Sequence, residues 1–161
     1  MNTEDEMRRI VVGVDGSVGS IAALRRAEHL ATAIGAHVEA IACWSVPAAL
    51  AVPYALGTVN FEDGARKNLE ETMVKAFGEK TPDNVSTRLV QGLPRQTLVE
   101  SSDGAEMLVL GRRGRGGFAG LLLGSVSQAC VSYARCPVLI MNPTGSVEES
   151  SGEGDGGPGV A

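Results

Sequence analysis

Aromatic residues and cysteines are scarce in this sequence, and each scarcity narrows what the chain can be. Aromatic side chains make up 4% of the 161 residues, so the core has to be built from Val, Ile, Leu and Ala. Such a composition is typical of buried strands covered closely by helices. The three cysteines, Cys43, Cys130 and Cys136, form no C-x-x-C pair and match no zinc-binding spacing. We therefore expect free thiols in a reducing, cytoplasmic environment.

Long apolar runs and an excess of basic charge are also missing. No uninterrupted apolar run reaches the ~18 residues of a membrane span, and the polar N-terminus does not resemble a secretory signal. The net charge is −5, but seven of the nineteen acidic residues lie in the first six and last fourteen positions. The remaining body carries a charge of about +2. We expect neither a membrane protein nor a general nucleic-acid binder.

Several catalytic and cofactor motifs are absent as well. The first predicted strand-to-helix turn contains Gly13, Gly16 and Gly19 at a spacing that differs from the dinucleotide-binding G-x-G-x-x-G. Neither a P-loop nor a G-x-S-x-G nucleophile turn occurs. His29 falls in a predicted helix and His37 at the start of a predicted strand, away from the expected site. A hydrolase that relies on Ser–His or Cys–His is therefore not expected.

What the sequence does contain is a regular alternation of apolar runs and helical patterns. Strands are predicted at 9–14, 38–44, 85–90, 107–110 and 138–141, and helices from Ser17 to Gly35 and at 61–77, 94–101 and 125–134. A loop of about fifteen residues separates Trp44 from Phe61. This βαβαβαβαβ order predicts an open α/β fold, a parallel sheet with helices on both faces. We expect one domain at 8–143, flanked by disordered segments at 1–7 and 144–161.

In an open parallel sheet, ligands bind beyond the carboxyl ends of the strands. After the fourth strand, residues 111–127 contain six glycines in seventeen positions, and Gly124-Ser125 stands where a helix begins. Backbone N–H groups at such a helix start suit an anion such as phosphate. An ordinary surface loop with a serine cap would give the same pattern, so both interpretations stay open from glycine content alone.

Two further candidates follow the first and second strands. Asp15 could accept hydrogen bonds from a ribose or an adenine, or it could simply cap the first helix. Cys43 and Trp44 could form a wall for an adenine, or they could be ordinary packing residues.

At these residues the chain resembles the universal stress protein family. The family hallmark, Gly-x2-Gly-x9-Gly-Ser/Thr, is matched without a gap by Gly111, Gly114, Gly124 and Ser125. Supporting similarities are Val-Gly-Val-Asp-Gly-Ser in the first strand, Gly-Ser-Val-Ser-Gln after the glycine loop and Cys-Pro-Val-Leu-Ile at the last strand. The resemblance extends from about residue 8 to residue 142.

The resemblance implies a Rossmann-like, five-stranded parallel sheet in the order 3-2-1-4-5, and a homodimer formed through the last strand at 138–141. In the ATP-binding branch of the family, Asp15 would contact the nucleoside and Cys43 would lie against adenine. Gly111 and Gly114 would line the ribose and the first phosphates. The distal phosphates, with Mg²⁺ held through them, would bind at Gly124, Ser125, Val126 and Ser127. Arg112 stands where serine is commoner, and it is included as a candidate that alters the phosphate contacts.

The resemblance, together with the glycine-rich loop, implies a dimeric module that binds ATP or another adenine nucleotide in a stress response. Two alternatives remain open: slow ATP hydrolysis or phosphoryl transfer, and a dimeric interaction module without nucleotide. No catalytic residue and no metal-binding set of side chains is identified. We also expect residues 112–123 to become ordered when phosphate binds.

Overall fold

The computed structural model describes residues 8–114 and 122–142, which form one five-stranded parallel sheet with helices on both faces. The strands are β1 (Arg9–Val14), β2 (His37–Trp44), β3 (Val85–Gln91), β4 (Met107–Gly111) and β5 (Val138–Met141). Their order in the sheet is β3-β2-β1-β4-β5. The helices are α1 (Val18–Ile34), α2 (Ala51–Ala55), α3 (Phe61–Phe77), α4 (Pro94–Ser101) and α5 (Ser125–Tyr133), with a 3-10 turn, η1, at Ala48–Leu50. The predicted fold class and strand order are confirmed.

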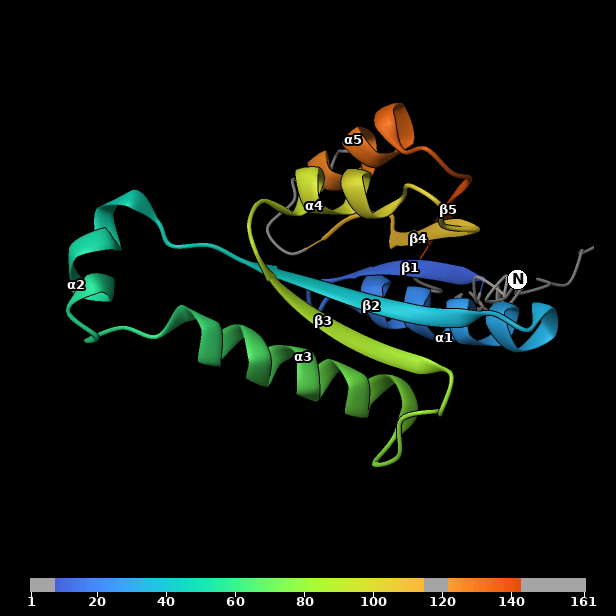
Figure 1. Ribbon diagram of the computed structural model, residues 1–161, viewed down its shortest axis with the longest axis horizontal. Helices are drawn as coiled ribbons and strands as arrows, with labels where there is room; N and C mark the ends of the chain where they lie inside the picture. The colour runs from blue at the N-terminus through green and yellow to red at the C-terminus, as the bar shows by residue number, and fades with distance from the viewer. Residues whose placement is uncertain (1–7, 115–121, 143–161) are drawn as a thin grey trace, which may run out of the picture.

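The sheet separates two cores (Figure 1). Helices α1 and α3 cover one face, and α4 and α5 cover the other. Successive residues of β1 contribute to opposite cores, so Ile10 and Val12 pack toward α1 and α3 while Val11 packs toward α4 and α5. Because β1 is central and buried on both faces, its apolar run is continuous in the sequence.

Helix α1 lies close against the sheet because its inner face consists largely of alanine. Ala23, Ala27 and Ala31 recur four residues apart, and all three are fully buried. Ser17 caps the helix by accepting a hydrogen bond from the Ser20 backbone N–H. Gly35 ends it in the left-handed conformation, as the sequence predicts.

The segment between Trp44 and Phe61 is not a plain loop, so this part of the prediction is wrong. It contains η1 and α2, which Figure 1 shows standing away from the sheet beyond the end of β2. The run Ala48 to Ala51 has high helix propensity, and Pro53 lies in the first turn of α2, where proline is tolerated. Ring contacts of Tyr54 with Trp44 (centroids 6.2 Å apart) and with Phe61 (6.4 Å) join this segment to the domain.

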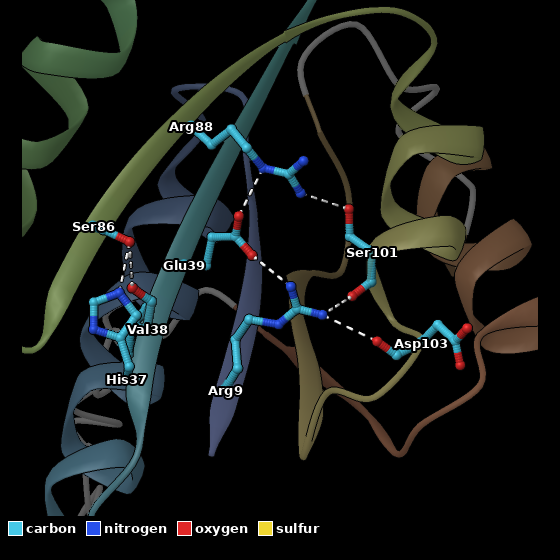
Figure 2. A network of polar contacts seen from close by, with 8 residues as sticks. All are labelled: Arg9, His37, Val38, Glu39, Ser86, Arg88, Ser101 and Asp103. Carbon is cyan, nitrogen blue, oxygen red and sulfur yellow. Dashed lines mark hydrogen bonds and ion pairs between the residues drawn. The ribbon is translucent and has the colours of Figure 1, made fainter. Parts of the chain in front are cut away.

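A network of charged side chains holds α4 over the sheet (Figure 2). The Glu39 carboxylate accepts a hydrogen bond from Arg9 at 3.1 Å and lies 2.7 Å from Nε of Arg88. Arg9 also donates to the backbone carbonyls of Ser101 and Asp103, and Arg88 donates to the Ser101 hydroxyl. The network thus links β1, β2 and β3 to the C-terminal end of α4.

Several sequence-based expectations fall on residues outside the described part of the chain. These are the disorder predicted for 1–7 and 144–161 and most of the loop predicted to order with phosphate, of which 115–121 is not described. In the described part, no helix is both long and apolar enough to cross a membrane.

Candidate functional site

A cavity of about 390 Å³ opens at the carboxyl ends of β1, β2 and β4, where an open parallel sheet binds its ligands. Its walls come from every part of the domain near this edge: the ends of these three strands, the starts of α1, α4 and α5, and one face of α3. A volume of this size falls within the usual range for small-molecule sites.

Eight of the nine predicted binding residues line this cavity. They are Asp15, Cys43, Gly111, Gly114, Gly124, Ser125, Val126 and Ser127. Arg112 is the exception: its backbone N–H donates to the Met141 carbonyl and extends the β4–β5 pairing, while its neighbour Arg113 lines the cavity. Within the described residues, Nε of Arg112 is buried without a hydrogen-bond partner. The structure therefore brings together all the predicted residues except Arg112.

The two ends of the hallmark segment are fixed by hydrogen bonds. The Gly124 N–H donates to the Arg112 carbonyl at 2.9 Å, and the Ser127 hydroxyl donates to the Gly111 carbonyl at 2.8 Å. Helix α5 begins at Ser125, and its intrahelical bonding begins when the Gln128 N–H donates to Gly124. The backbone N–H groups of the first turn, at 125–127, are therefore left for a ligand, as at any helix N-terminus.

Gly111 is required by packing between β4 and α1. A side-chain carbon at this position would lie 2.7 Å from the carbonyl carbon of Gly19 and 2.9 Å from its Cα. These are backbone atoms, which cannot move aside without shifting the helix. The first hallmark glycine therefore lets α1 approach the strand, in addition to lining the cavity.

Gly114 has a different role, because it makes room for the carboxylate of Asp15. A side-chain carbon at 114 would overlap Oδ2 of Asp15. The other carboxylate oxygen, Oδ1, accepts a hydrogen bond from the Ser17 backbone N–H at 2.9 Å. Asp15 is thus held at the start of α1 and against the hallmark loop at once. The sequence alone left capping and ligand contact as alternatives, and this geometry is compatible with both.

One side of the cavity is largely apolar. It is formed by the end of β2, the start of α4, β4 and the start of α5, through Ile41, Ala42, Cys43, Pro94, Leu98, Leu110 and Val126. Burial raises the pKa of the Cys43 thiol, an effect that the hydrogen bond with Thr97 and the charge of Arg88 only partly offset. Cys43 is therefore a neutral thiol at pH 7 and belongs chemically to the apolar wall.

The other two cysteines do not reach the cavity. Cys130, on the buried face of α5, is fully buried in the core that α4 and α5 share with the sheet, and Cys136 is partly buried against the same core. Burial and the neighbouring Cys136 raise the pKa of Cys130 to about 11. Both behave as small apolar residues.

Sequence reasoning missed the contribution of α3. Ala65 and Asn68 line the cavity, and the Asn68 side chain donates to the Asp15 carbonyl at 3.3 Å. The signal was present: the buried stripe of α3 runs through Leu69, Thr72 and Met73, and its N-terminal continuation changes to a small and an amide side chain. A polar residue on the buried stripe of an amphipathic helix marks a place where that helix faces something other than core.

Charge in the cavity is sparse. Among the described lining residues, the ionisable side chains of opposite sign are Asp15 and Arg113. Elsewhere in the described chain, no group of three or more His, Cys, Asp or Glu residues could hold a metal ion. His37 contacts Ser86 at the opposite end of the sheet, and His29 is exposed on α1, so neither can act in the cavity.

Comparison with known proteins gives a consistent result. Residues 6–142 match the model of the universal stress protein family. A universal stress protein of Mycobacterium tuberculosis is 36% identical over 132 residues, which cover 81% of this chain and 44% of that protein. One from Methanocaldococcus jannaschii is 28% identical over 144 residues and is covered over 85% of its length. The chain therefore spans less than half of the mycobacterial relatives it matches.

Solved structures agree on the fold. UspA from Lactobacillus plantarum superposes with a TM-score of 0.68 at 21% identity, covering 83% of this chain and 97% of that one. A universal stress protein crystallised in complex with cAMP superposes with a TM-score of 0.55 at 28% identity, covering 86% and 98%.

Proposed function

This chain belongs to the universal stress protein family, and on that premise we propose that it binds an adenine nucleotide of the ATP class in the cavity at the carboxyl edge of its sheet. The observation that carries the proposal is the convergence of the hallmark residues with Asp15 and Cys43 around one cavity. Binding, rather than turnover, is the activity that this cavity serves.

The strand order arranges the lining residues to match the parts of a nucleotide. In the sheet, β1 lies between β2 and β4. The apolar wall begins at the end of β2, with Cys43, and suits a base. The N–H groups at the start of α5, with Arg113 near the end of β4, suit phosphates. Asp15, after β1, lies between them, where the sugar of a nucleotide connects base to phosphate.

The relative that was crystallised with cAMP supports an adenine base in particular. It is 28% identical to this chain and shares its fold over 98% of its own length. The flat faces of an adenine ring pack well against apolar side chains, so the base fits against a wall that lacks ionised groups. Neutral Cys43 is compatible with such a base.

Catalysis of phosphoryl transfer is not favoured by the lining. That chemistry needs metal ions, cationic groups on the transferred phosphate and a residue that positions the nucleophile. Among the described lining residues, Arg113 could supply the cationic group, but no histidine or second carboxylate accompanies Asp15 to position water. A divalent cation in this cavity would be bound mainly by phosphate oxygens of the nucleotide, which is how Mg²⁺ commonly accompanies ATP.

We extend the proposal to a homodimer formed through β5. Among the described strands, β5 is an edge of the sheet, and all four of its residues are only half-buried in the single chain. Val131 and Tyr133 of the adjacent α5 are exposed as well, by 52% and 72%. An edge strand that presents apolar side chains is a template for pairing with a second copy.

The test is a thermal unfolding series with ATP and with GTP, using a variant that fills the cavity. Ala65→Leu places a larger side chain among the lining residues, whereas Ala33→Leu, on the exposed face of α1, adds the same atoms outside it. Ligand at about 100 times its Kd stabilises a folded protein by about 2.7 kcal/mol. We expect ATP to raise the unfolding temperature of wild type and Ala33→Leu, and to have little effect on Ala65→Leu.

Two results would count against this function. Wild-type protein that is folded but gains no stability from ATP would contradict nucleotide binding. An equal gain in all three proteins would place the nucleotide somewhere other than this cavity.

A further inference from the structure

Asn68 lines the cavity beside Asp15, where the proposed function puts the sugar of a bound nucleotide. It lies on α3, outside the hallmark motif, and its carboxamide contacts the backbone of Asp15. Asp15 follows β1, the strand between the apolar end of the cavity and its phosphate end. A group that touches Asp15 therefore faces the middle of the ligand, neither its base nor its phosphates.

The backbone around Asn68 is fixed. The buried Thr72 hydroxyl donates to the Asn68 carbonyl at 2.6 Å, one turn along α3, and Leu69 beside it is packed in the core. Ala65, which precedes Asn68 by three residues on α3, also lines the cavity, and its side chain is a single methyl group. The side chain is consequently presented to the cavity from a rigid helix, which is the arrangement that gives a binding residue its selectivity.

The chemistry of the carboxamide matches a sugar hydroxyl. A carboxamide has two N–H donors and one oxygen acceptor, and the bond to the Asp15 carbonyl uses a single N–H. A hydroxyl also donates and accepts, so it can accept from the second N–H or donate to the oxygen. The carboxylate of Asp15, which can only accept when ionised, complements it at the adjacent hydroxyl.

We infer that Asn68 is the residue through which this protein distinguishes a ribonucleotide from its deoxy analogue, by a hydrogen bond to a ribose hydroxyl. The inference rests on the proposed function, because it assigns a role within the same cavity. It also adds α3 to a site whose other polar contacts come from the strand ends and from α1 and α5.

The experiment is a calorimetric comparison of ATP, 2′-deoxy-ATP and 3′-deoxy-ATP on wild type and Asn68→Ala. We expect wild type to bind ATP about three- to tenfold more tightly than one of the two deoxy analogues, the value of one hydrogen bond. Asn68→Ala should weaken ATP binding by the same factor and leave the binding of that analogue unchanged. A contact with the ligand produces this pattern because the analogue already lacks the partner.

A merely structural role predicts something different. If Asn68 acts only by holding the backbone of Asp15, the variant weakens all three nucleotides equally, and that result would overturn the inference. Equal affinity of wild type for all three would overturn it too. Failure of wild type to bind ATP at all would instead contradict the proposed function itself, and this inference with it.

Asn84→Ala is the matched control. Asn84 also makes one long-range side-chain hydrogen bond of 3.3 Å, to Thr32, but it does so at the amino end of β3, away from the cavity. Each variant therefore removes one hydrogen bond donated by a side-chain amide, and the two bonds lie at opposite ends of the sheet. We expect Asn84→Ala to bind all three nucleotides as wild type does, and unfolding curves of both variants verify that each is folded.

Discussion

Gly111 and Gly19 meet where β4 passes beneath α1, at a separation that admits no side-chain carbon. Gly111→Ala should therefore lower the free energy of unfolding by about 1–3 kcal/mol, the usual cost of forcing extra atoms into a packed interior. Chemical denaturation measures this directly. Gly64→Ala is the control, because Gly64 lies within α3 with no atom close to the added carbon.

Alanine has a higher helix propensity than glycine, so Gly64→Ala should raise the stability by about 1 kcal/mol. Opposite signs for the two glycine substitutions would support the packing role of Gly111. A Gly111→Ala protein as stable as wild type would show that α1 can shift at no cost, and that this glycine is needed for the ligand alone.

Some residues of the cavity could be predicted from the sequence, and others could not. The hallmark spacing pointed to Gly114, Gly124 and Ser125, which line one cavity because these positions follow a strand and open a helix. It could not distinguish Arg112 from Arg113. Which side chain reaches the cavity depends on how the backbone turns after β4, and the extra pairing of Arg112 with Met141 sets that turn. Asn68 could not be assigned without the packing of α3 beside Asp15.

Among the elements, α4 depends on charge as well as on apolar contact. It is eight residues long and buries only Leu98 fully, so the network centred on Glu39 helps to hold it over the sheet. Glu39→Gln removes the charge that faces Arg9 and Arg88, and the Glu39 side chain is only 15% exposed. We expect the free energy of unfolding to fall by about 1–2 kcal/mol, since hydrogen bonds to charged groups contribute more to stability than hydrogen bonds between neutral groups.

Glu71→Gln is the comparison for that loss. Glu71 is 54% exposed and lies 4.0 Å from Lys67 on the surface of α3, so its substitution should change stability by less than about 0.5 kcal/mol. Equal effects of the two substitutions, measured by urea denaturation, would show that the Figure 2 network has no more influence than an ordinary surface ion pair.

The five strands and the four helices α1, α3, α4 and α5 were predictable from their patterns, whereas η1 and α2 were not. Strands β1, β4 and β5 are largely apolar runs, and α1 and α3 each show a helical stripe over seventeen residues. Strand β3 is less apolar, but turn residues mark both of its ends. In contrast, η1 and α2 are too short to show a period, and two prolines in their segment favour a loop in any reading of the sequence alone. The tertiary contacts of Tyr54 with Trp44 and Phe61 supply what the local pattern lacks.

For the whole molecule, the dimer proposal predicts a solution mass of twice the 16.7 kDa of one chain. Ile140→Lys places a charge on the half-buried edge strand β5, whereas Val90→Lys makes a similar change on β3, the other edge. Light scattering should find a dimer for wild type and Val90→Lys and a monomer for Ile140→Lys, because charge on an edge strand opposes pairing. If Ile140→Lys stays dimeric and Val90→Lys becomes monomeric, the interface lies on β3 instead.

Calorimetric titration of the full chain with ATP and Mg²⁺ is the direct measurement of whether this domain binds an adenine nucleotide at the carboxyl edge of its sheet. We expect saturable binding close to one nucleotide per chain, which Gly114→Ala should greatly weaken because a methyl group there displaces the Asp15 carboxylate. A flat titration with protein whose circular dichroism and unfolding transition are intact would contradict this binding, and it would favour a universal stress protein that acts through its surface alone.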